Sequence, residues 1–267
     1  MSNIAITGAG GRMGKALIEA IAGTDGIQLT VAVEHSESSL IGVDAGEASG
    51  LGRNNVAVVS SLEELADSFD VLIDFSVPVA TVENAEFCRR HGKKMVIGTT
   101  GLSTDQVQII QQASDYTAIC MASNFSTGVN LCFKLAALAA SVLGADADVE
   151  ISEAHHRNKI DAPSGTALSL GESVAGALGR NLDEVAVYDR QDLTSVRGSE
   201  AIGFSVVRAG DIVGDHTVLF ASEGERIEIT HKASSRMAFA LGAIRASKWI
   251  DKQPVGLFDM QDVLGLK

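Results

Sequence analysis

Short apolar runs alternate with amphipathic segments along roughly the first 125 residues of the chain. The apolar runs have the length of buried strands and lie at residues 3–7, 27–33, 56–59, 71–75, 95–98 and 118–121. Helical periodicity follows the first of them at residues 15–22, and further helical segments follow later runs. Such alternation predicts a doubly wound, mainly parallel sheet.

Capping residues indicate where several of these helices begin and end. Ser61 and Ser103 each stand three residues before a Glu or Gln, which is the spacing of a capping box, so a helix is expected after each. The helix after Pro78 is expected to end before Gly92, because glycine suits a helix C-terminus. Residues 36–55 are rich in Gly, Ser and Asp and are expected to form a long loop.

The pattern changes after Ser126. A long apolar helix is expected over residues 128–143, which fits a packed core or a subunit contact. After it, one helix at 166–178 and a final helix at 234–247 accompany strand-like runs at 148–153, 185–188, 202–208, 216–221 and 226–231. Close succession of strands predicts an antiparallel or mixed sheet, and therefore a second domain of the α+β type.

Composition narrows the class of protein. The chain has 267 residues and a formal charge of −13, so we expect one large or two ordinary domains and no general nucleic-acid binding. No apolar run reaches the roughly 18 residues of a membrane span, and no basic leader opens the chain. Cys88, Cys120 and Cys132 are odd in number and mostly lie among apolar residues, which favours reduced thiols and the cytoplasm.

A glycine-rich turn joins the first strand to the first helix. Gly8, Gly11 and Gly14 suit a tight turn, a close approach of the backbone to a pyrophosphate, and close packing of helix on strand. Glu34 ends the second strand twenty residues later, where an acidic residue usually takes the ribose hydroxyls and favours NAD; a plain solvent-facing strand end is the alternative. Arg12 and His35 could soften that preference. The ends of later strands, which bear Phe75, Thr99, Thr100, Asn124 and Phe125, are expected to face the nucleotide crevice.

Residues 153–166 combine titratable and cationic side chains with a helix start. His155 and His156 stand within four residues of Arg157 and Lys159, and residues 164–166 are small and open the next helix. Histidine transfers protons near neutral pH, and a helix N-terminus favours anions. The segment therefore predicts an anion site with an acid beside it; a solvated basic loop before an ordinary helix cap is the alternative. A metal site is disfavoured, because the fixed cations oppose a divalent ion.

Six motifs, in order along essentially the whole chain, resemble the dihydrodipicolinate reductase (4-hydroxy-tetrahydrodipicolinate reductase) family: residues 8–14, 98–101, 153–166, 208–214, 231–237 and 256–260. The resemblance implies reduction of 4-hydroxy-tetrahydrodipicolinate to tetrahydrodipicolinate by NADH or NADPH, with loss of water, in the diaminopimelate route to lysine. It further implies a dinucleotide-binding domain at 1–126 and 236–267, and a substrate-binding and oligomerisation domain at 127–235 that forms a homotetramer.

The resemblance also assigns roles to residues. His155 would be the proton donor and acceptor and Lys159 a proton donor, while His156, Gly165 and Thr166 would hold the dicarboxylate substrate. The chemistry of the side chains and helix start adds Arg236 and Ser164 as anion contacts. The cofactor would lie along Gly8, Ala9, Gly10, Gly11, Arg12, Met13, Glu34, His35, Phe75, Gly98, Thr99, Thr100, Ala122, Ser123, Asn124 and Phe125. Asn158 stands where the family often has a histidine, and His35 where an arginine often follows the acidic residue. The second departure leads us to expect NADH to serve as well as NADPH or better.

Two other functions fit parts of the sequence. An amino-acid dehydrogenase of similar domain plan would have less need for an anion site that holds two carboxylates. A non-catalytic protein that binds NAD would need no acid beside an anion site, so the pairing of His155 with Lys159 counts against it.

Overall fold

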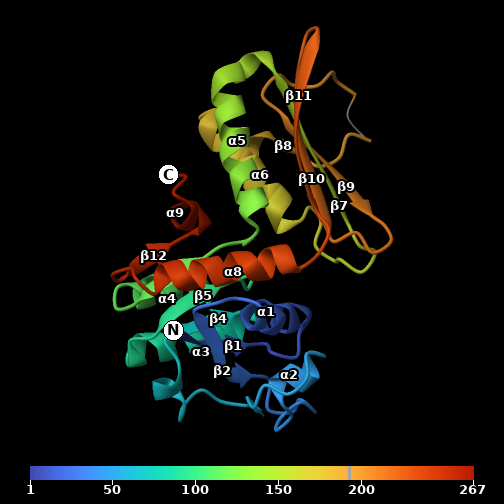
Figure 1. Cartoon of the computed structure of the whole chain (residues 1–267). Helices are drawn as coiled ribbons and strands as arrows, with labels where there is room; N and C mark the ends of the chain where they lie inside the picture. The colour runs from blue at the N-terminus through green and yellow to red at the C-terminus, as the bar shows by residue number, and fades with distance from the viewer. Residues whose placement is uncertain (192–193) are drawn as a thin grey trace. The chain divides into compact units, whose positions relative to one another are not determined.

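The computed structural model describes residues 1–191 and 194–267 (Figure 1). The described chain forms two compact units: unit 1 comprises Met1–Thr127 and Arg236–Lys267, and unit 2 comprises Gly128–Ser235. Within the described ranges, no helix combines the length and the apolar character needed to cross a membrane.

Unit 1 is built on a seven-stranded sheet in the order β12-β6-β5-β4-β1-β2-β3. All neighbouring strands are parallel. The strands are β1 (Ser2–Thr7), β2 (Ile27–Val33), β3 (Val58–Val59), β4 (Val71–Asp74), β5 (Lys94–Ile97), β6 (Ala118–Met121) and β12 (Gly256–Phe258). Chain order reverses between β1 and β4, so a crevice lies beyond the carboxyl ends of these two strands. The predicted doubly wound sheet is confirmed.

Helices cover both faces of this sheet. They are α1 (Arg12–Ala22), α2 (Ala45–Ala48), α3 (Pro78–His91), α4 (Thr104–Ser114), α8 (Met237–Ile250) and α9 (Met260–Leu264). Successive strand residues point to opposite faces; accordingly Ile4 and Ile6 join one buried cluster with α1 and α8, and Ala5 joins another with α3 and α4. Because both faces are buried, the central strands need the continuous apolar runs seen in the sequence.

Two of the three capping signals led to the expected helices. Ser103 and Gln106 form the capping box of α4, and α3 ends at Gly92 with φ of 62°. The helix expected after Ser61 is wrong. The Ser61 hydroxyl instead accepts a hydrogen bond from the N–H of Glu63, and only a 3-10 turn follows, η1 (Ala66–Ser68).

Unit 2 has a five-stranded sheet in the order β11-β10-β7-β9-β8. The strands are β7 (Asp148–His155), β8 (Ala186–Val187), β9 (Ile202–Arg208), β10 (Gly214–Ser222) and β11 (Glu225–Ala233). β10 is antiparallel to both of its neighbours, whereas β9 is parallel to β7 and β8, so the sheet is mixed as predicted. The helices of this region are α5 (Thr127–Leu143), η2 (Gly144–Asp146), α6 (Gly165–Ala177) and α7 (Leu182–Val185). The strand expected at 185–188 is shorter, because α7 extends to Val185.

Candidate active site

The glycine turn of unit 1 is shaped by close backbone contacts. Gly8 has φ of 72°, and a Cβ there would stand 2.6 Å from the carbonyl oxygen of Phe75. A Cβ at Gly14 would stand 2.2 Å from the carbonyl oxygen of Gly8, so α1 can begin against the turn only with glycine at this position. The turn therefore lets the backbone approach a phosphate group closely, and the N-terminus of α1 favours its charge. These residues fit a dinucleotide pyrophosphate.

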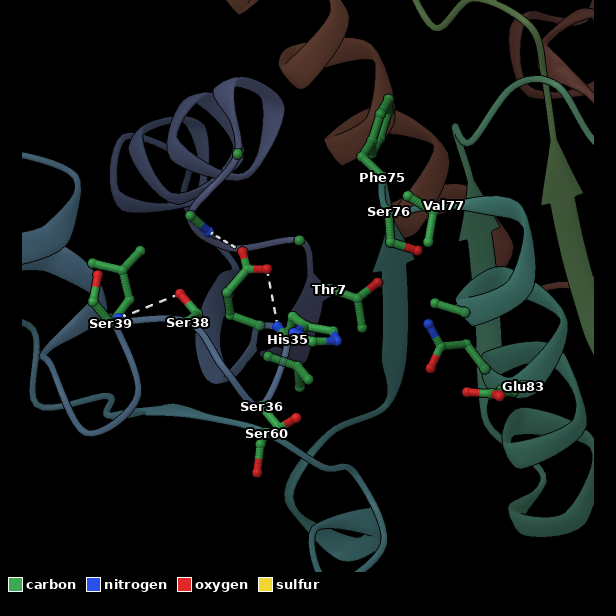
Figure 2. Close-up of a pocket in the computed structure, with 18 residues that line it drawn as sticks. Thr7, His35, Ser36, Ser38, Ser39, Ser60, Phe75, Ser76, Val77 and Glu83 are labelled. Carbon is green, nitrogen blue, oxygen red and sulfur yellow. Dashed lines mark hydrogen bonds between the residues drawn. The ribbon is translucent and has the colours of Figure 1, made fainter.

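Glu34 lies at the carboxyl end of β2, beside the glycine turn. Its carboxylate accepts a hydrogen bond from the N–H of Gly10 at 2.7 Å and another from the N–H of His35 at 2.9 Å (Figure 2). The imidazole Nδ1 of His35 accepts a hydrogen bond from the N–H of Glu37, which leaves Nε2 to carry the proton. These contacts hold the Glu34 side chain in place beside the glycine turn, and His35 presents an N–H donor.

An open cavity of about 940 Å³ lies next to this pair. Its wall includes Gly8, Gly10, Gly11, Glu34, His35 and Phe75, and hydroxyl side chains that carried no sequence prediction: Thr7, Ser36, Ser38, Ser39, Ser60 and Ser76. The volume is in the range of small-molecule sites. Ser36, Ser38 and Ser39 lie in the loop after β2 that composition predicted, whereas Ser60 follows β3 and Ser76 follows β4. The sequence did not predict that these side chains face a cavity.

A second cavity, of about 390 Å³, brings two arginines together. Arg12 and Arg236 line it with the candidate cofactor residues Gly11, Met13, Phe75, Gly98, Thr99 and Thr100. Burial, and the charge of Arg12, lower the pKa of Arg236 from its usual value. Arg236 was expected to hold substrate, and in the structure it belongs to unit 1 and lies among the candidate cofactor residues.

Aromatic packing positions the strand ends. A Cβ at Gly98 would stand 2.1 Å from the ring of Phe75, so that ring rests on bare backbone. Phe125 is buried, and its ring centroid is 5.7 Å from that of Phe75. The other members of the segment after β6 are Ala122, Ser123 and Asn124, and the Asn124 side chain accepts a hydrogen bond from the N–H of Ser126. Phe125 therefore connects this segment to Phe75.

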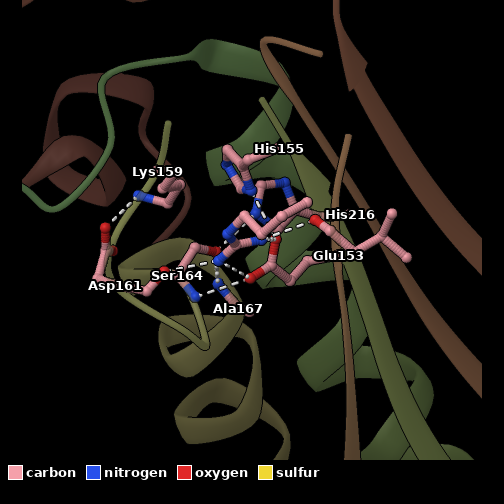
Figure 3. Close-up of polar contacts among 9 residues, drawn as sticks. Glu153, His155, Lys159, Asp161, Ser164, Ala167 and His216 are labelled. Carbon is pink, nitrogen blue, oxygen red and sulfur yellow. Dashed lines mark hydrogen bonds and ion pairs between the residues drawn. The ribbon is translucent and has the colours of Figure 1, made fainter. Parts of the chain in front are cut away.

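In unit 2, the buried face of β7 changes from apolar to ionisable along one strand. Alternate residues Val149, Ile151, Glu153 and His155 are buried, as a period of two requires. The imidazole Nδ1 of His155 lies 2.5 Å from the Glu153 carboxylate (Figure 3). The strand was expected to end at Glu153, but it continues to His155 and places both side chains on the same face.

Glu153 is held by several donors. Arg208 donates from both terminal nitrogens to the two carboxylate oxygens, at 2.8 and 2.9 Å, and the N–H of Ser164 donates at 3.0 Å. Burial raises the pKa of Glu153, but the hydrogen bonds from Arg208, His155 and Ser164 outweigh it and hold the pKa below its usual value. Glu153 is therefore a carboxylate at neutral pH.

The environment of His155 opposes its charge. Burial is the main cause that lowers its pKa below the usual value, and the positive charges of Lys159 and Arg208 act in the same direction. Glu153 acts in the opposite direction through its hydrogen bond and its charge. The net effect lowers the pKa of His155, which makes its charged form a stronger acid, while the contact with Glu153 limits the shift.

His216 packs against His155 from the neighbouring strand β10. The two rings meet edge to face with centroids 5.0 Å apart, and His216 Nε2 lies 3.0 Å from the Ser164 hydroxyl. That hydroxyl also caps α6 by accepting a hydrogen bond from the N–H of Ala167. Burial, then the charge of His155, lower the pKa of His216 to about 3. His216 is neutral and joins the start of α6 to the site.

The depressed pKa of His216 predicts a pH-dependent stability. The unfolded chain takes up a proton near pH 6.5 and the folded chain only near pH 3, so the free energy of unfolding should fall as pH falls between these values, by up to about 1.4 kcal/mol per pH unit. Urea unfolding at several pH values measures this dependence. Between pH 6 and 4 the free energy of unfolding of His216→Gln should change less with pH than that of wild type. Equal slopes in wild type and variant would contradict the assignment.

The remaining candidates occupy the loop after β7 and the start of α6. Lys159 forms an ion pair with Asp161 at 2.8 Å, and the carbonyl oxygen of Asp161 accepts a hydrogen bond from Arg208. Nδ1 of His156 is buried and has no hydrogen-bond partner among residues 1–191 and 194–267. Gly165 and Thr166 form the first turn of α6. Across those same ranges, no cluster of His, Cys, Asp or Glu has a composition that could hold a metal ion.

Models of one protein family match both parts of the chain. "Dihydrodipicolinate reductase, N-terminus" matches residues 2–125, and "Dihydrodipicolinate reductase, C-terminus" matches residues 128–264. The chain belongs to the dihydrodipicolinate reductase family. It is an NAD(P)H-dependent oxidoreductase that reduces 4-hydroxy-tetrahydrodipicolinate to tetrahydrodipicolinate, with loss of water, in the diaminopimelate pathway of lysine biosynthesis. The predicted family, fold class and reaction are confirmed.

Solved structures agree with this assignment. The chain is similar to the dipicolinate-bound dihydrodipicolinate reductase from Paenisporosarcina sp. TG-14, with 25% identity over 98% of each chain and a TM-score of 0.77. An amine dehydrogenase from Mycobacterium smegmatis (14% identity, 96% of this chain and 94% of that chain, TM-score 0.62) shares the fold. So does a probable dehydrogenase from Thermotoga maritima (12% identity, 98% and 92%, TM-score 0.64). The family match decides against the alternative amino-acid dehydrogenase and the non-catalytic NAD-binding protein.

Proposed function

We propose that His155 supplies the proton that the reaction consumes. Adding a hydride to the substrate and losing its hydroxyl as water takes up one proton per turnover. The bound nicotinamide dinucleotide supplies the hydride. The single observation that carries the proposal is the buried contact of 2.5 Å between His155 and the ionised Glu153. This contact stabilises the charged form of an imidazole that lies in the predicted anion-binding segment, residues 153–166. Its test is the substitution of His155 considered in the Discussion.

The substrate is proposed to be a small dicarboxylate held in unit 2. Support comes from the dipicolinate bound in the similar Paenisporosarcina structure. Lys159 brings a positive charge, His156 brings an imidazole nitrogen without a partner in the described ranges, and α6 begins with the N–H groups of Gly165 and Thr166. In the bound state Lys159 would exchange Asp161 for a substrate carboxylate and would assist as a second proton donor.

Replacing Lys159 with glutamine should reduce kcat/KM for the substrate. Losing one charge-assisted contact corresponds to about 1–2 kcal/mol, or roughly 5–30-fold. KM should rise through the lost contact, and kcat should fall through the lost proton donor. Arg157→Gln is a matched control, because Arg157 is an exposed cation of the same loop to which we assign no role. A Lys159 variant that behaves like the Arg157 variant in steady-state kinetics would exclude the contact.

The cofactor is proposed to lie along unit 1, which would be the dinucleotide-binding domain. The pyrophosphate would bind to the glycine turn and contact Arg12 and Arg236 in the second cavity. The hydroxyls of the adenosine ribose would contact Glu34 in the first cavity. A carboxylate repels a 2′-phosphate, whereas the neutral N–H of His35 attracts it only weakly. NADH should therefore serve equally well or better than NADPH.

Unit 2 is further proposed to assemble the protein into a homotetramer. An apolar groove of about 310 Å³ between α5 and β11 supports this, with a wall of Leu135, Leu138, Ala139, Val142, Leu143, Ile227 and Ile229. Leu138 and Val142 are 58% and 76% exposed, although large apolar side chains are normally buried.

Leu138→Glu should dissociate this assembly. A charge in an apolar contact costs several kcal/mol, because it loses its hydration without gaining a partner. Light scattering after gel filtration should show about four times the chain mass of 27.8 kDa for wild type, and a smaller species for the variant. Leu257→Glu, on an exposed leucine of β12 in unit 1, is the control and should leave the mass unchanged. A wild-type mass equal to one chain would refute the tetramer.

The cytoplasm is the proposed location. Cys88, Cys120 and Cys132 are free thiols, which suits a reducing compartment. The charge of −13 argues against nucleic acid as a partner. Cell fractionation with activity measured in each fraction tests the location.

A further inference from the structure

Glu153 and Arg208 belong to motifs of the chain that the roles proposed so far leave unexplained. Both lie in unit 2, on the neighbouring strands β7 and β9, and the register sets Arg208 opposite His155. We infer that Glu153 is a positioning residue for His155, and this inference rests on the proposed role of His155 as the proton donor. Arg208 holds Glu153, and Glu153 fixes a proton on Nδ1 of His155. The atom that exchanges a proton with the substrate is then Nε2.

The donor and acceptor roles follow from the partners of the carboxylate. An ionised carboxylate can only accept hydrogen bonds, so the 2.5 Å contact requires a proton on Nδ1 of His155. In the neutral ring Nε2 then carries the free lone pair, and in the charged ring Nε2–H is the proton that can leave. In each turnover Nε2 gives up one proton and later takes one back from solvent. The proton on Nδ1 stays on the ring, hydrogen-bonded to the Glu153 carboxylate.

Arg208 explains why Glu153 does not take that proton itself. Its two terminal nitrogens bind both carboxylate oxygens, and one of them also donates to the carbonyl oxygen of Asp161. With the N–H of Ser164 as a further donor, the carboxylate is 3% exposed and yet fully paired. A paired carboxylate of this kind remains ionised while the neighbouring imidazole changes charge.

The opposite edge of the imidazole is kept clear by a glycine. Gly214 begins β10, and a Cβ at this position would stand 3.0 Å from Nε2 of His155. The motif at residues 208–214 therefore contributes at both of its ends: Arg208 holds Glu153, and Gly214 places no side chain against Nε2. Neither function was visible in the sequence, because both depend on strand pairing.

Charged and titratable groups face His155 from every neighbouring element. They are Glu153 on its own strand, Arg208 on β9, His216 on β10, and Lys159 with Asp161 in the loop after β7. Among residues 1–191 and 194–267, Glu153 is the negatively charged group that contacts the ring. Removing this charge should therefore make the imidazolium harder to form, while the cations that oppose it remain.

Glu153→Gln is the first test. A glutamine amide can donate to Nδ1 and favour the wrong tautomer, so kcat should fall by about 10²–10⁴, with KM changed much less. Activity that needs the charged imidazole is lost as pH rises through its pKa. The alkaline limb of kcat/KM should therefore move to lower pH, by about 1–3 units.

Glu150→Gln provides a matched control. Glu150 lies on the same strand and is also held by two arginines, Arg190 at 2.6 Å and Arg197 at 3.0 Å, but it does not contact His155. Both variants break a carboxylate–arginine cluster, so both should lower the unfolding midpoint. Only the Glu153 variant should shift the pH profile. A shift of the same size in both would assign Glu153 a structural role only and overturn the inference.

Two measurements separate this inference from the role of His155 itself. In wild-type protein with ¹⁵N-labelled histidine, the neutral His155 ring should carry its proton on Nδ1, whether or not His155 is the acid; a proton on Nε2 overturns the inference even if Glu153→Gln fails to fold. In a His155→Gln background, Glu153→Gln should lower kcat no further, because Glu153 acts through the ring. Additive losses would also overturn it. If wild-type His155 carries its proton on Nδ1 and the His155→Gln enzyme is nevertheless active, the proposed proton donor is refuted and the inference about the tautomer stands.

Discussion

Replacing His155 with glutamine should lower kcat by about 10²–10⁴, the usual contribution of general acid catalysis, and should change KM much less. Glutamine keeps a polar side chain of similar length at a position where His155 is 8% exposed, but it has no group that titrates near neutral pH. The loss should therefore appear in the step that uses the proton. Steady-state rates with substrate generated in situ, followed by oxidation of the nicotinamide, measure it directly.

The control for this substitution is His91→Gln, which changes an exposed histidine at the end of α3 in unit 1. It should leave both kinetic constants close to wild type. Unfolding midpoints of the two variants show whether a lost rate reflects lost structure. A folded His155 variant that keeps near-normal kcat would reject the proton-donor role and leave Lys159 as the acid to be tested next.

Cofactor preference should move toward NADPH when Glu34→Ala is combined with His35→Arg. One repulsion is lost and one permanent positive charge is gained, which together correspond to about 1–3 kcal/mol, or a factor of about 5–150 in the ratio of kcat/KM values. Wild type should use both cofactors, with NADH equal or better. Initial rates with each cofactor, for wild type and variant, give this ratio.

The hydrogen bonds of Glu34 suggest a second variant for this experiment. The Glu34 carboxylate accepts hydrogen bonds from the N–H groups of Gly10 and His35. Alanine at position 34 therefore also removes the acceptor for the N–H of Gly10 in the glycine turn. Glu34→Gln with His35→Arg removes the negative charge but keeps a side-chain oxygen for Gly10. Both double variants should favour NADPH if charge is the cause. A wild type that strongly prefers NADPH, or two variants with unchanged preference, would mean that Glu34 does not face the ribose.

Much of unit 1 could be predicted because its signals are local. An apolar run buried on both faces, a glycine turn and an amphipathic helix are each read within a few residues, and they recur along the chain. The failure at Ser61 has the same origin. A capping box is also a local signal, but Ser61 formed a turn with Glu63, and nothing in the next few residues showed which alternative would prevail. Strand β12 was not predicted, since three residues of Gly256–Phe258 become a strand only by pairing with β6.

The sequence by itself determined the family, the dinucleotide-binding fold and the segment with His155 and Lys159. Residues close together in one segment keep their spacing along the chain however the rest of the chain folds. Only the tertiary structure decided that Arg208 holds Glu153, that His216 meets Ser164, and that Arg236 shares a cavity with Arg12. The physical reason is that strand register and helix packing bring together side chains far apart along the chain. Those contacts depend on burying the whole sheet, and no short stretch of sequence encodes them.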